Sequence, residues 1–197
     1  MKYIIGLTGK TGAGKSVIAE KLRSAGAYVI DGDKVSREVL VTVKSLLGDL
    51  KDAFGDGIIA ADGTLDRKAL ARTAFANERN TAKLNSIFHP AVNVVIDESV
   101  TEALKTYDVA VVDAAAIIES GYADKCSMLA VVTAPEDVRL LRITERDSIS
   151  REDALIRINA QKPDDFYFSK ADFIIRNYEP FNIDDEIKPL LRLISKT

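Results

Sequence analysis

A glycine-rich stretch near the start of the chain places the strongest constraint on its fold. It matches G-x-x-x-x-G-K-[ST], the pattern of a phosphate-binding P-loop, and its residues are Gly9-Lys10-Thr11-Gly12-Ala13-Gly14-Lys15-Ser16. The glycines let backbone N–H groups approach phosphate oxygens closely. Lys15 would supply a cation for the β- and γ-phosphates, and the Ser16 hydroxyl is suited to binding Mg²⁺.

The segments on either side of this loop predict a strand before it and a helix after it. The apolar run Tyr3–Leu7 is typical of a buried strand. Residues 16–25 repeat apolar side chains at helical spacing before Gly26, namely Val17, Ile18, Leu22 and Ala25. This order points the positive end of a helix dipole at a bound anion. The context favours binding of a nucleotide phosphate over a glycine turn that only joins two core elements.

The composition is that of a globular protein without a strongly charged surface. With 197 residues, 47% of them hydrophobic, the chain can bury a full core. A net charge of −3 argues against a nucleic-acid or membrane-surface partner. No apolar stretch approaches the roughly 20 residues that span a bilayer. Cys126 is the single cysteine, which predicts that the chain has no internal disulfide. Only a five-residue apolar run precedes the loop, which predicts that there is no signal peptide. We expect a cytoplasmic monomer or small homo-oligomer.

Acidic residues follow two further predicted strands. Residues 27–30 are apolar and precede Asp31-Gly32-Asp33, and residues 109–112 precede Asp113. In an open α/β sheet, ligands bind at the carboxyl ends of the strands. Asp33 could therefore accept the proton of a substrate hydroxyl, or it could cap the helix predicted from residue 34. Asp113 fits a Walker-B carboxylate that supports Mg²⁺, although a turn also favours Asp.

Two more apolar runs, 128–132 and 173–175, complete a predicted five-stranded parallel sheet, and residues 183–194 form a closing helix. We therefore expect an α/β P-loop nucleotide-binding core made of residues 1–33, 106–138 and 166–197. Residues 34–105 are predicted to be a helical insertion that binds a second substrate, because so much helix exceeds what a crossover needs. Residues 139–165 are predicted to be a helical lid.

Helix signals recur throughout the insertion. The pattern predicts one helix over 34–52, and Asp66 and Asn77 as caps of the next two helices. Pro90 suits the first position of a further helix. His89, the single histidine, could hydrogen bond at that helix start or contact a substrate. Arg67 could be a solvated charge or a phosphate ligand, and the pattern leaves both alternatives open.

The predicted lid carries three arginines at helical spacing. Arg139, Arg142 and Arg146 follow Pro135 and would lie near one face of a helix. They could pair with neighbouring carboxylates, but beside a P-loop we favour phosphate contacts for at least one of them. Ser150 then begins a capping box before the second helix of the lid.

Taken together, these motifs resemble the dephospho-CoA kinase family along nearly the whole chain. The matching segments are Gly6–Gly9 with Gly14–Ser16, Asp31–Asp33, Phe54-Gly55, Asp62–Arg67, Ile87–Pro90, Asp113 with Glu119, Arg142 with Arg146, Gln161, and Ala171-Asp172 with Asn177. The resemblance implies transfer of the γ-phosphoryl group of ATP to the ribose 3′-hydroxyl of dephospho-CoA, with Mg²⁺. Another P-loop kinase, for a nucleoside or a small hydroxyl acceptor, is the alternative. A GTPase is disfavoured because no Asn/Thr-Lys-x-Asp motif is present, and intact Lys15, Ser16 and Asp33 disfavour a binding-only protein.

The resemblance also implies a role for each candidate residue. Lys15, Asp33 and Arg142 would be catalytic, with Asp33 orienting or deprotonating the acceptor hydroxyl. Arg67 and His89 would help Asp33 to hold dephospho-CoA. The nucleotide would be bound by Gly12, Ala13, Gly14, Lys15, Ser16, Val17, Arg142 and Asn177, and Mg²⁺ by Ser16 and Asp113.

Two places depart from the family pattern. The family usually has Pro-Leu-Leu between Asp113 and the following glutamate, where this chain has Ala115-Ala116-Ile117. The middle residue of the usual Asp-Ala-Asp is here Gly32. Losing the proline would loosen the loop after the third strand, and Ala116 would remove packing volume on the substrate side, so we expect these departures to affect the shape of the acceptor pocket more than the type of reaction.

Overall fold

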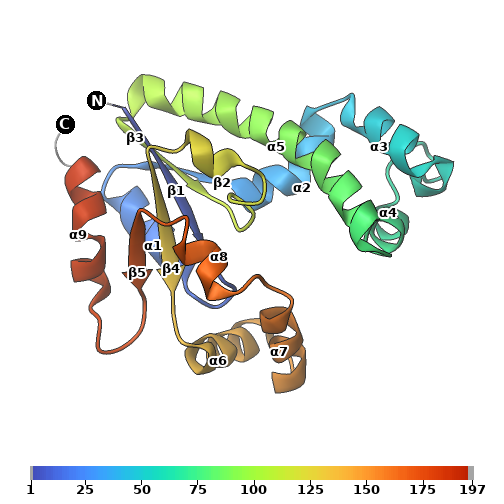
Figure 1. Cartoon of the computed structure of the whole chain (residues 1–197). Coiled ribbons are helices and arrows are strands. Elements are labelled where there is room, and N and C mark those ends of the chain that lie inside the picture. Colours follow the sequence, from blue (N-terminus) through green and yellow to red (C-terminus); the bar gives the residue numbers. More distant parts are fainter. Residues whose placement is uncertain (1, 195–197) are drawn as a thin grey trace. The chain divides into compact units, whose positions relative to one another are not determined.

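The computed structural model describes residues 2–194 and contains a five-stranded parallel sheet (Figure 1). The strands are β1 (Tyr3–Gly9), β2 (Tyr28–Asp31), β3 (Val109–Asp113), β4 (Met128–Thr133) and β5 (Phe173–Arg176). Their order across the sheet is β2-β3-β1-β4-β5, and every neighbouring pair is parallel. The predicted fold class, a five-stranded parallel sheet flanked by helices, is confirmed.

Both faces of the central strands are buried. Val109 and Val111 of β3 belong to the core cluster on one face, while Ala110 and Val112, which point the other way, are also buried. A strand that is apolar on both sides is expected in a parallel sheet that is covered above and below. The continuous apolar runs in the sequence have this physical cause.

Helices α1 (Lys15–Ser24) and α9 (Ile183–Ile194) contact each other and share one core cluster with the sheet. Ile18 and Leu22 of α1 meet Ile187 and Leu190 of α9 in that cluster. Packing against α9 and the strands holds α1 in place, so its first turn stays at the end of β1, where the loop lies (Figure 1).

Residues Lys34–Glu98 form one compact unit, and the rest of the described chain forms the other. The elements in or crossing the first unit are α2 (Gly32–Thr42), α3 (Leu46–Phe54), the 3-10 turn η1 (Asp56–Ile58), α4 (Arg67–Ala74) and α5 (Glu78–Thr106). Both predicted caps are confirmed. Asp66 accepts hydrogen bonds from the N–H groups of Lys68 and Ala69, and Asn77 accepts one from Asn80.

Two helix boundaries differ from the sequence-based expectation. The single helix predicted over 34–52 is two helices, interrupted at residues 43–45. A run of β-branched residues precedes this break and lowers helix propensity there. The helix predicted to start at Pro90 is wrong, because Pro90 lies inside the 29-residue helix α5. Val92, Ile96 and Val100, which follow Pro90 in α5, are buried, and their packing offsets the N–H that Pro90 lacks.

The remaining elements are the 3-10 turn η2 (Tyr122–Lys125), α6 (Glu136–Asp147), α7 (Arg151–Asn159) and the short α8 (Asp164–Phe168). The sequence pattern did not predict α8. Helices α6 and α7 form a hairpin with its own apolar cluster, made of Leu140, Ile143, Ala154 and Ile158. Ser150 caps α7 by accepting the Asp153 N–H, so the predicted cap is confirmed.

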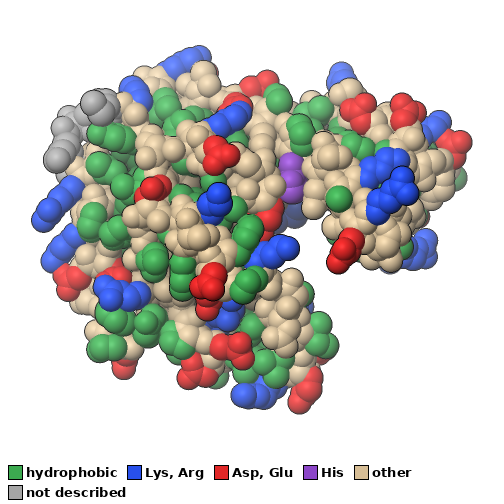
Figure 2. Space-filling model, viewed as in Figure 1, with side chains coloured by type: hydrophobic (Ala, Val, Ile, Leu, Met, Phe, Trp, Pro, Cys, Tyr) green, Lys and Arg blue, Asp and Glu red, His purple; other side chains and the backbone are tan. Residues whose placement is uncertain are grey.

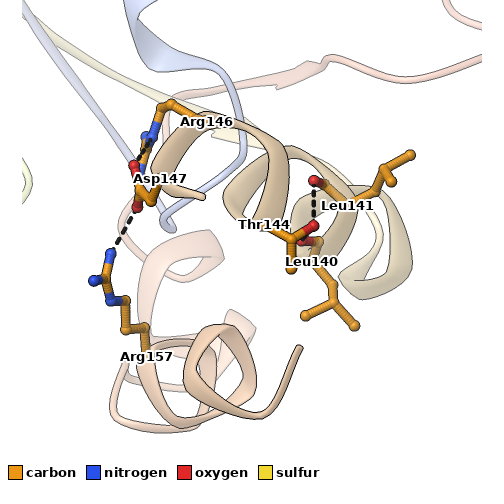
Figure 3. A network of polar contacts seen from close by, with 6 residues as sticks. All are labelled: Leu140, Leu141, Thr144, Arg146, Asp147 and Arg157. Atoms are coloured by element: carbon orange, nitrogen blue, oxygen red, sulfur yellow. Dashed lines mark hydrogen bonds and ion pairs between the residues drawn. The ribbon is translucent and has the colours of Figure 1, made fainter. Parts of the chain in front are cut away.

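A polar network joins the end of α6 to α7 (Figure 3). Asp147 accepts two hydrogen bonds from Arg146 and one of 2.6 Å from Arg157. The hydrogen bond from Arg146 is the main reason that the pKa of the Asp147 carboxyl lies below its usual value. Arg146 is therefore engaged with a carboxylate, which matches the pairing alternative for this arginine.

On the face drawn in Figure 2, acidic and basic side chains are interspersed, consistent with the small net charge. Within residues 2–194, none of the helices combines the length and apolar character that crossing a bilayer requires.

Candidate active site

The glycine loop joins the end of β1 to the start of α1 through backbone conformations that favour glycine. Gly12 has φ +78° and Gly14, the residue before α1, has φ +92°. A Cβ on Gly12 would lie 2.7 Å from the Arg139 carbonyl oxygen. A Cβ on Gly14 would lie 2.1 Å from Asn177 Nδ2. The loop is therefore packed closely against α6 and the end of β5, while its amides stand at the N-terminus of α1, where an anion is favoured.

The side chains of Arg142 and Asn177 donate hydrogen bonds to backbone carbonyl oxygens of the loop. The Arg142 guanidinium donates to the carbonyl oxygens of Gly12 (3.3 Å), Ala13 (3.4 Å) and Asn177 (2.9 Å). Asn177 Nδ2 donates to the Ala13 carbonyl at 2.8 Å. Two residues predicted to contact the nucleotide thus lie directly on the phosphate-binding loop, although they are more than a hundred positions from it in the sequence.

Lys15 and Asp113 form an ion pair at the centre of the site. Lys15 Nζ lies 2.5 Å from Asp113 Oδ1, and both side chains are only 17% exposed. Asp113 is the last residue of β3 and pairs in register with Leu7 of β1 and Asp31 of β2. Burial raises the pKa of the Asp113 carboxyl, Lys15 opposes that effect, and the charges of Asp33 and Asp31 raise it further. The carboxylates that follow β2 and β3 therefore share one electrostatic environment beside the loop lysine.

Asp33 lies in this cluster rather than capping a helix. Helix α2 begins at Gly32, so Asp33 is already in its first turn. Its half-buried carboxylate accepts a 3.2 Å hydrogen bond from the Ala115 N–H, just past the end of β3. This contact disfavours the cap alternative and leaves the proton-acceptor alternative in place.

Mg²⁺ would find oxygen ligands on two elements of the site. Ser16 presents a hydroxyl in the exposed first turn of α1, and Asp113 presents a carboxylate at the end of β3. Magnesium is usually bound by one or two protein oxygens together with phosphate and water oxygens. The donor chemistry therefore fits Mg²⁺. Among the described residues, no group of three or more His, Cys, Asp or Glu is arranged to hold a metal.

The remaining predicted residues are Val17, Arg67 and His89. Val17 follows Ser16 in the first turn of α1, is 47% exposed, and donates its amide to the Gly14 carbonyl at 3.1 Å. Arg67 and His89 belong to the other compact unit. The Arg67 guanidinium donates to the Arg37 carbonyl, and His89 lies in the middle of α5, which excludes a role at a helix start.

Sequence reasoning missed several contacts that support the loop. Lys10 forms a 2.6 Å ion pair with Asp164 of α8, and the Thr11 N–H donates to Gln161 Oε1 at 3.0 Å. Arg139 is 4% exposed, and its Nη1 has no hydrogen-bond partner among the described residues. Of the residues in these contacts, Gln161 had a sequence signal as part of the family pattern, and Arg139 was one of the three arginines for which a phosphate contact was considered. The others depend on tertiary contacts that periodicity does not predict.

A glycine loop with its lysine, followed by strand-end carboxylates on a parallel sheet, defines the class of P-loop nucleotide-binding proteins. Two solved structures share the whole fold. TT1252 from Thermus thermophilus has a TM-score of 0.79 and 28% identity over 97% of both chains. Dephospho-CoA kinase from Campylobacter jejuni has a TM-score of 0.70 and 28% identity over 100% of this chain and 98% of that one.

The sequence comparisons identify the family. The family model for dephospho-CoA kinase matches residues 3–182. A curated dephospho-CoA kinase from Corynebacterium glutamicum is 37% identical over 88% of this chain and 87% of the relative. The chain belongs to the dephospho-CoA kinase family of ATP-dependent phosphotransferases, which confirms the resemblance inferred from the motifs.

Proposed function

We propose that the chain transfers the γ-phosphoryl group of ATP to the 3′-hydroxyl of dephospho-CoA and releases coenzyme A and ADP. The observation that carries the proposal is the gathering of Lys15, Asp113 and Asp33 beside the phosphate-binding loop. Membership of the family supports this acceptor over a nucleoside or another small hydroxyl compound.

In this proposal, the loop and two cations bind the donor. The amides from Gly12 to Val17 surround the phosphate groups, and Lys15 exchanges its contact with Asp113 for the β- and γ-phosphates. Arg142, which lies on the loop, neutralises charge on the transferring group, and Asn177 keeps the loop in shape. Cationic groups placed in this way can contribute about 10³-fold or more to the rate.

Asp33 acts on the acceptor. Its carboxylate orients the 3′-hydroxyl and accepts its proton as the hydroxyl oxygen bonds to the γ-phosphorus and the bond from phosphorus to the ADP oxygen breaks. Ser16 and Asp113 are the residues that would hold Mg²⁺, which when bound neutralises charge on the β- and γ-phosphates. The main work of the protein is therefore positioning and charge neutralisation.

The helical insertion, residues 34–105, binds the acceptor in this account through Arg67 and His89. Residues 139–165 act as a lid, which is supported by the separate apolar cluster of α6 and α7. The single cysteine supports a location in the reducing cytoplasm.

The test is ADP release from ATP and Mg²⁺ with dephospho-CoA, adenosine, uridine or no acceptor. Turnover with dephospho-CoA alone is the expected result. Turnover with a nucleoside instead would retain the kinase core and refute the acceptor. ATP binding without turnover under any condition would refute the catalytic proposal.

A further inference from the structure

The carboxylate proposed as the proton acceptor is held by a backbone amide from another element. Asp33 Oδ1 accepts the Ala115 N–H at 3.2 Å, across 82 positions of the chain. With one oxygen held in this way, the second oxygen and its lone pairs remain for the acceptor hydroxyl. A hydrogen bond to a charged group is also stronger than one between neutral groups.

The segment that supplies this amide is itself fixed at both ends. The Ala114 N–H donates to the Leu7 carbonyl at 3.1 Å, which extends the pairing of β3 with β1 by one residue. The fully buried Thr8 hydroxyl donates to the Ala115 carbonyl at 3.2 Å. The position of the amide is therefore set by the central strand β1, the same strand that leads into the phosphate-binding loop.

A glycine brings the carboxylate within reach of this amide. A Cβ on Gly32 would lie 2.6 Å from the Ala114 Cβ and 3.3 Å from the Asp113 carbonyl oxygen. Real Cβ atoms do not approach other carbons so closely, and the neighbouring atoms lie at the end of a buried strand. A larger residue at position 32 would push the start of α2, and Asp33 with it, away from Ala115.

We propose that the Ala115 amide, with Gly32 and Thr8 as its supports, is a positioning device for Asp33 in phosphoryl transfer. The inference rests on the proposed role of Asp33 as proton acceptor. It explains the two departures from the family pattern together, because Gly32 permits the close approach and a residue other than proline at position 115 supplies the N–H that proline lacks.

The test compares Ala115→Pro with Ala115→Ser in the full chain. Serine keeps the amide and position 115 is exposed, so this variant should have a kcat within twofold of the wild type. Proline removes the donor, and kcat should fall about tenfold, which corresponds to losing one hydrogen bond to a charged group. KM for ATP should stay within twofold, because the ATP site loses no contact. Equal kcat values for the two variants, or a fall in kcat matched by a rise in KM for ATP, would overturn the inference.

Two further variants keep the result interpretable. Asp33→Ala tests the role on which the inference rests. If the kcat of Asp33→Ala equals that of the wild type, the proposed role of Asp33 is wrong. If Asp33→Ala loses most of its kcat while Ala115→Pro keeps the wild-type kcat, only the positioning device is refuted. If Ala115→Pro does not fold by circular dichroism, Gly32→Ala takes its place, since it displaces Asp33 without removing the amide. Gly32→Ala should lower kcat with unchanged KM for ATP, and an unchanged kcat would refute the device.

Discussion

Replacement of Gly12 by alanine tests how closely the phosphate-binding loop is packed. The loop motif leaves this position open to any residue, yet the structure requires a glycine there. Its φ is +78°, and an added Cβ would lie 2.7 Å from the carbonyl oxygen of Arg139 and 3.0 Å from its Cα and Cβ. These atoms belong to helix α6, so no flexible side chain can move aside to make room.

Two effects set the size of the loss. A left-handed conformation costs a residue with a Cβ about 1–2 kcal/mol. Forcing an extra methyl group against close-packed atoms costs about 1–3 kcal/mol. Together they predict a loss of about 2–5 kcal/mol in the free energy of unfolding. In a chain of this size, each kcal/mol lowers Tm by about 2–4 °C, so Tm should fall by about 4–20 °C.

Thermal unfolding followed by circular dichroism, with and without ATP and Mg²⁺, measures both consequences. The stabilisation that saturating ATP gives the wild type should shrink in Gly12→Ala, because relief of the clash displaces the loop amides. Gly48→Ala is the matched control. An added Cβ on Gly48 meets no atom within 4 Å, and the position is helical, so alanine should stabilise the chain by about 0.5–1 kcal/mol. An unchanged Tm and ATP response in Gly12→Ala would refute the packing argument.

Three further predictions concern acidic residues. Asp66→Ala removes the cap of α4 and should cost about 1 kcal/mol, a fall of about 2–4 °C in Tm; no change in Tm would contradict the capping contacts. Asp147→Asn should lower Tm at pH 7, and because the folded-state pKa of Asp147 is depressed, the difference from the wild type should disappear as the pH falls below the usual value of 3.8. A difference that does not shrink as the pH falls below 3.8 would refute the ionic origin. Asp113→Asn should raise the Mg²⁺ concentration needed for half-maximal activity. Burial raises the folded-state pKa of Asp113, so without nucleotide the Asp113→Asn variant should be more stable than the wild type at pH 7. This gain in stability should vanish below pH 3.8. A variant that is less stable than the wild type at pH 7 would contradict this prediction.

Much of the fold could be predicted because its signals are local. Apolar runs such as Tyr3–Leu7 and the caps Asp66 and Ser150 depend on residues only a few positions apart, and each was found. The helix start predicted at Pro90 was wrong because the preference of proline for the first turn of a helix is also a local rule, and Pro90 lies inside α5. Burial of Val92, Ile96 and Val100 after Pro90 outweighs one missing hydrogen bond, and burial is a property of the whole fold.

The features of the candidate site also fall into those predicted by local sequence patterns and those that depend on the fold. The loop, Lys15 and Asp113 were identified from short patterns. The contacts that shape the site join distant segments, such as Gly12 with Arg139, and Asp33 with Ala115. No spacing rule predicts that a particular backbone amide will reach a particular carboxylate. The roles of Arg67 and His89 stay predictions for kinetic tests.

The proposed reaction is tested by identifying the product formed from ATP, Mg²⁺ and dephospho-CoA with ³¹P and ¹H NMR. We expect one new phosphomonoester, coupled to the ribose H3′, formed in step with ADP by the wild type and largely lost in Asp33→Asn. A phosphate at another hydroxyl, or inorganic phosphate as the sole partner of ADP, would contradict it.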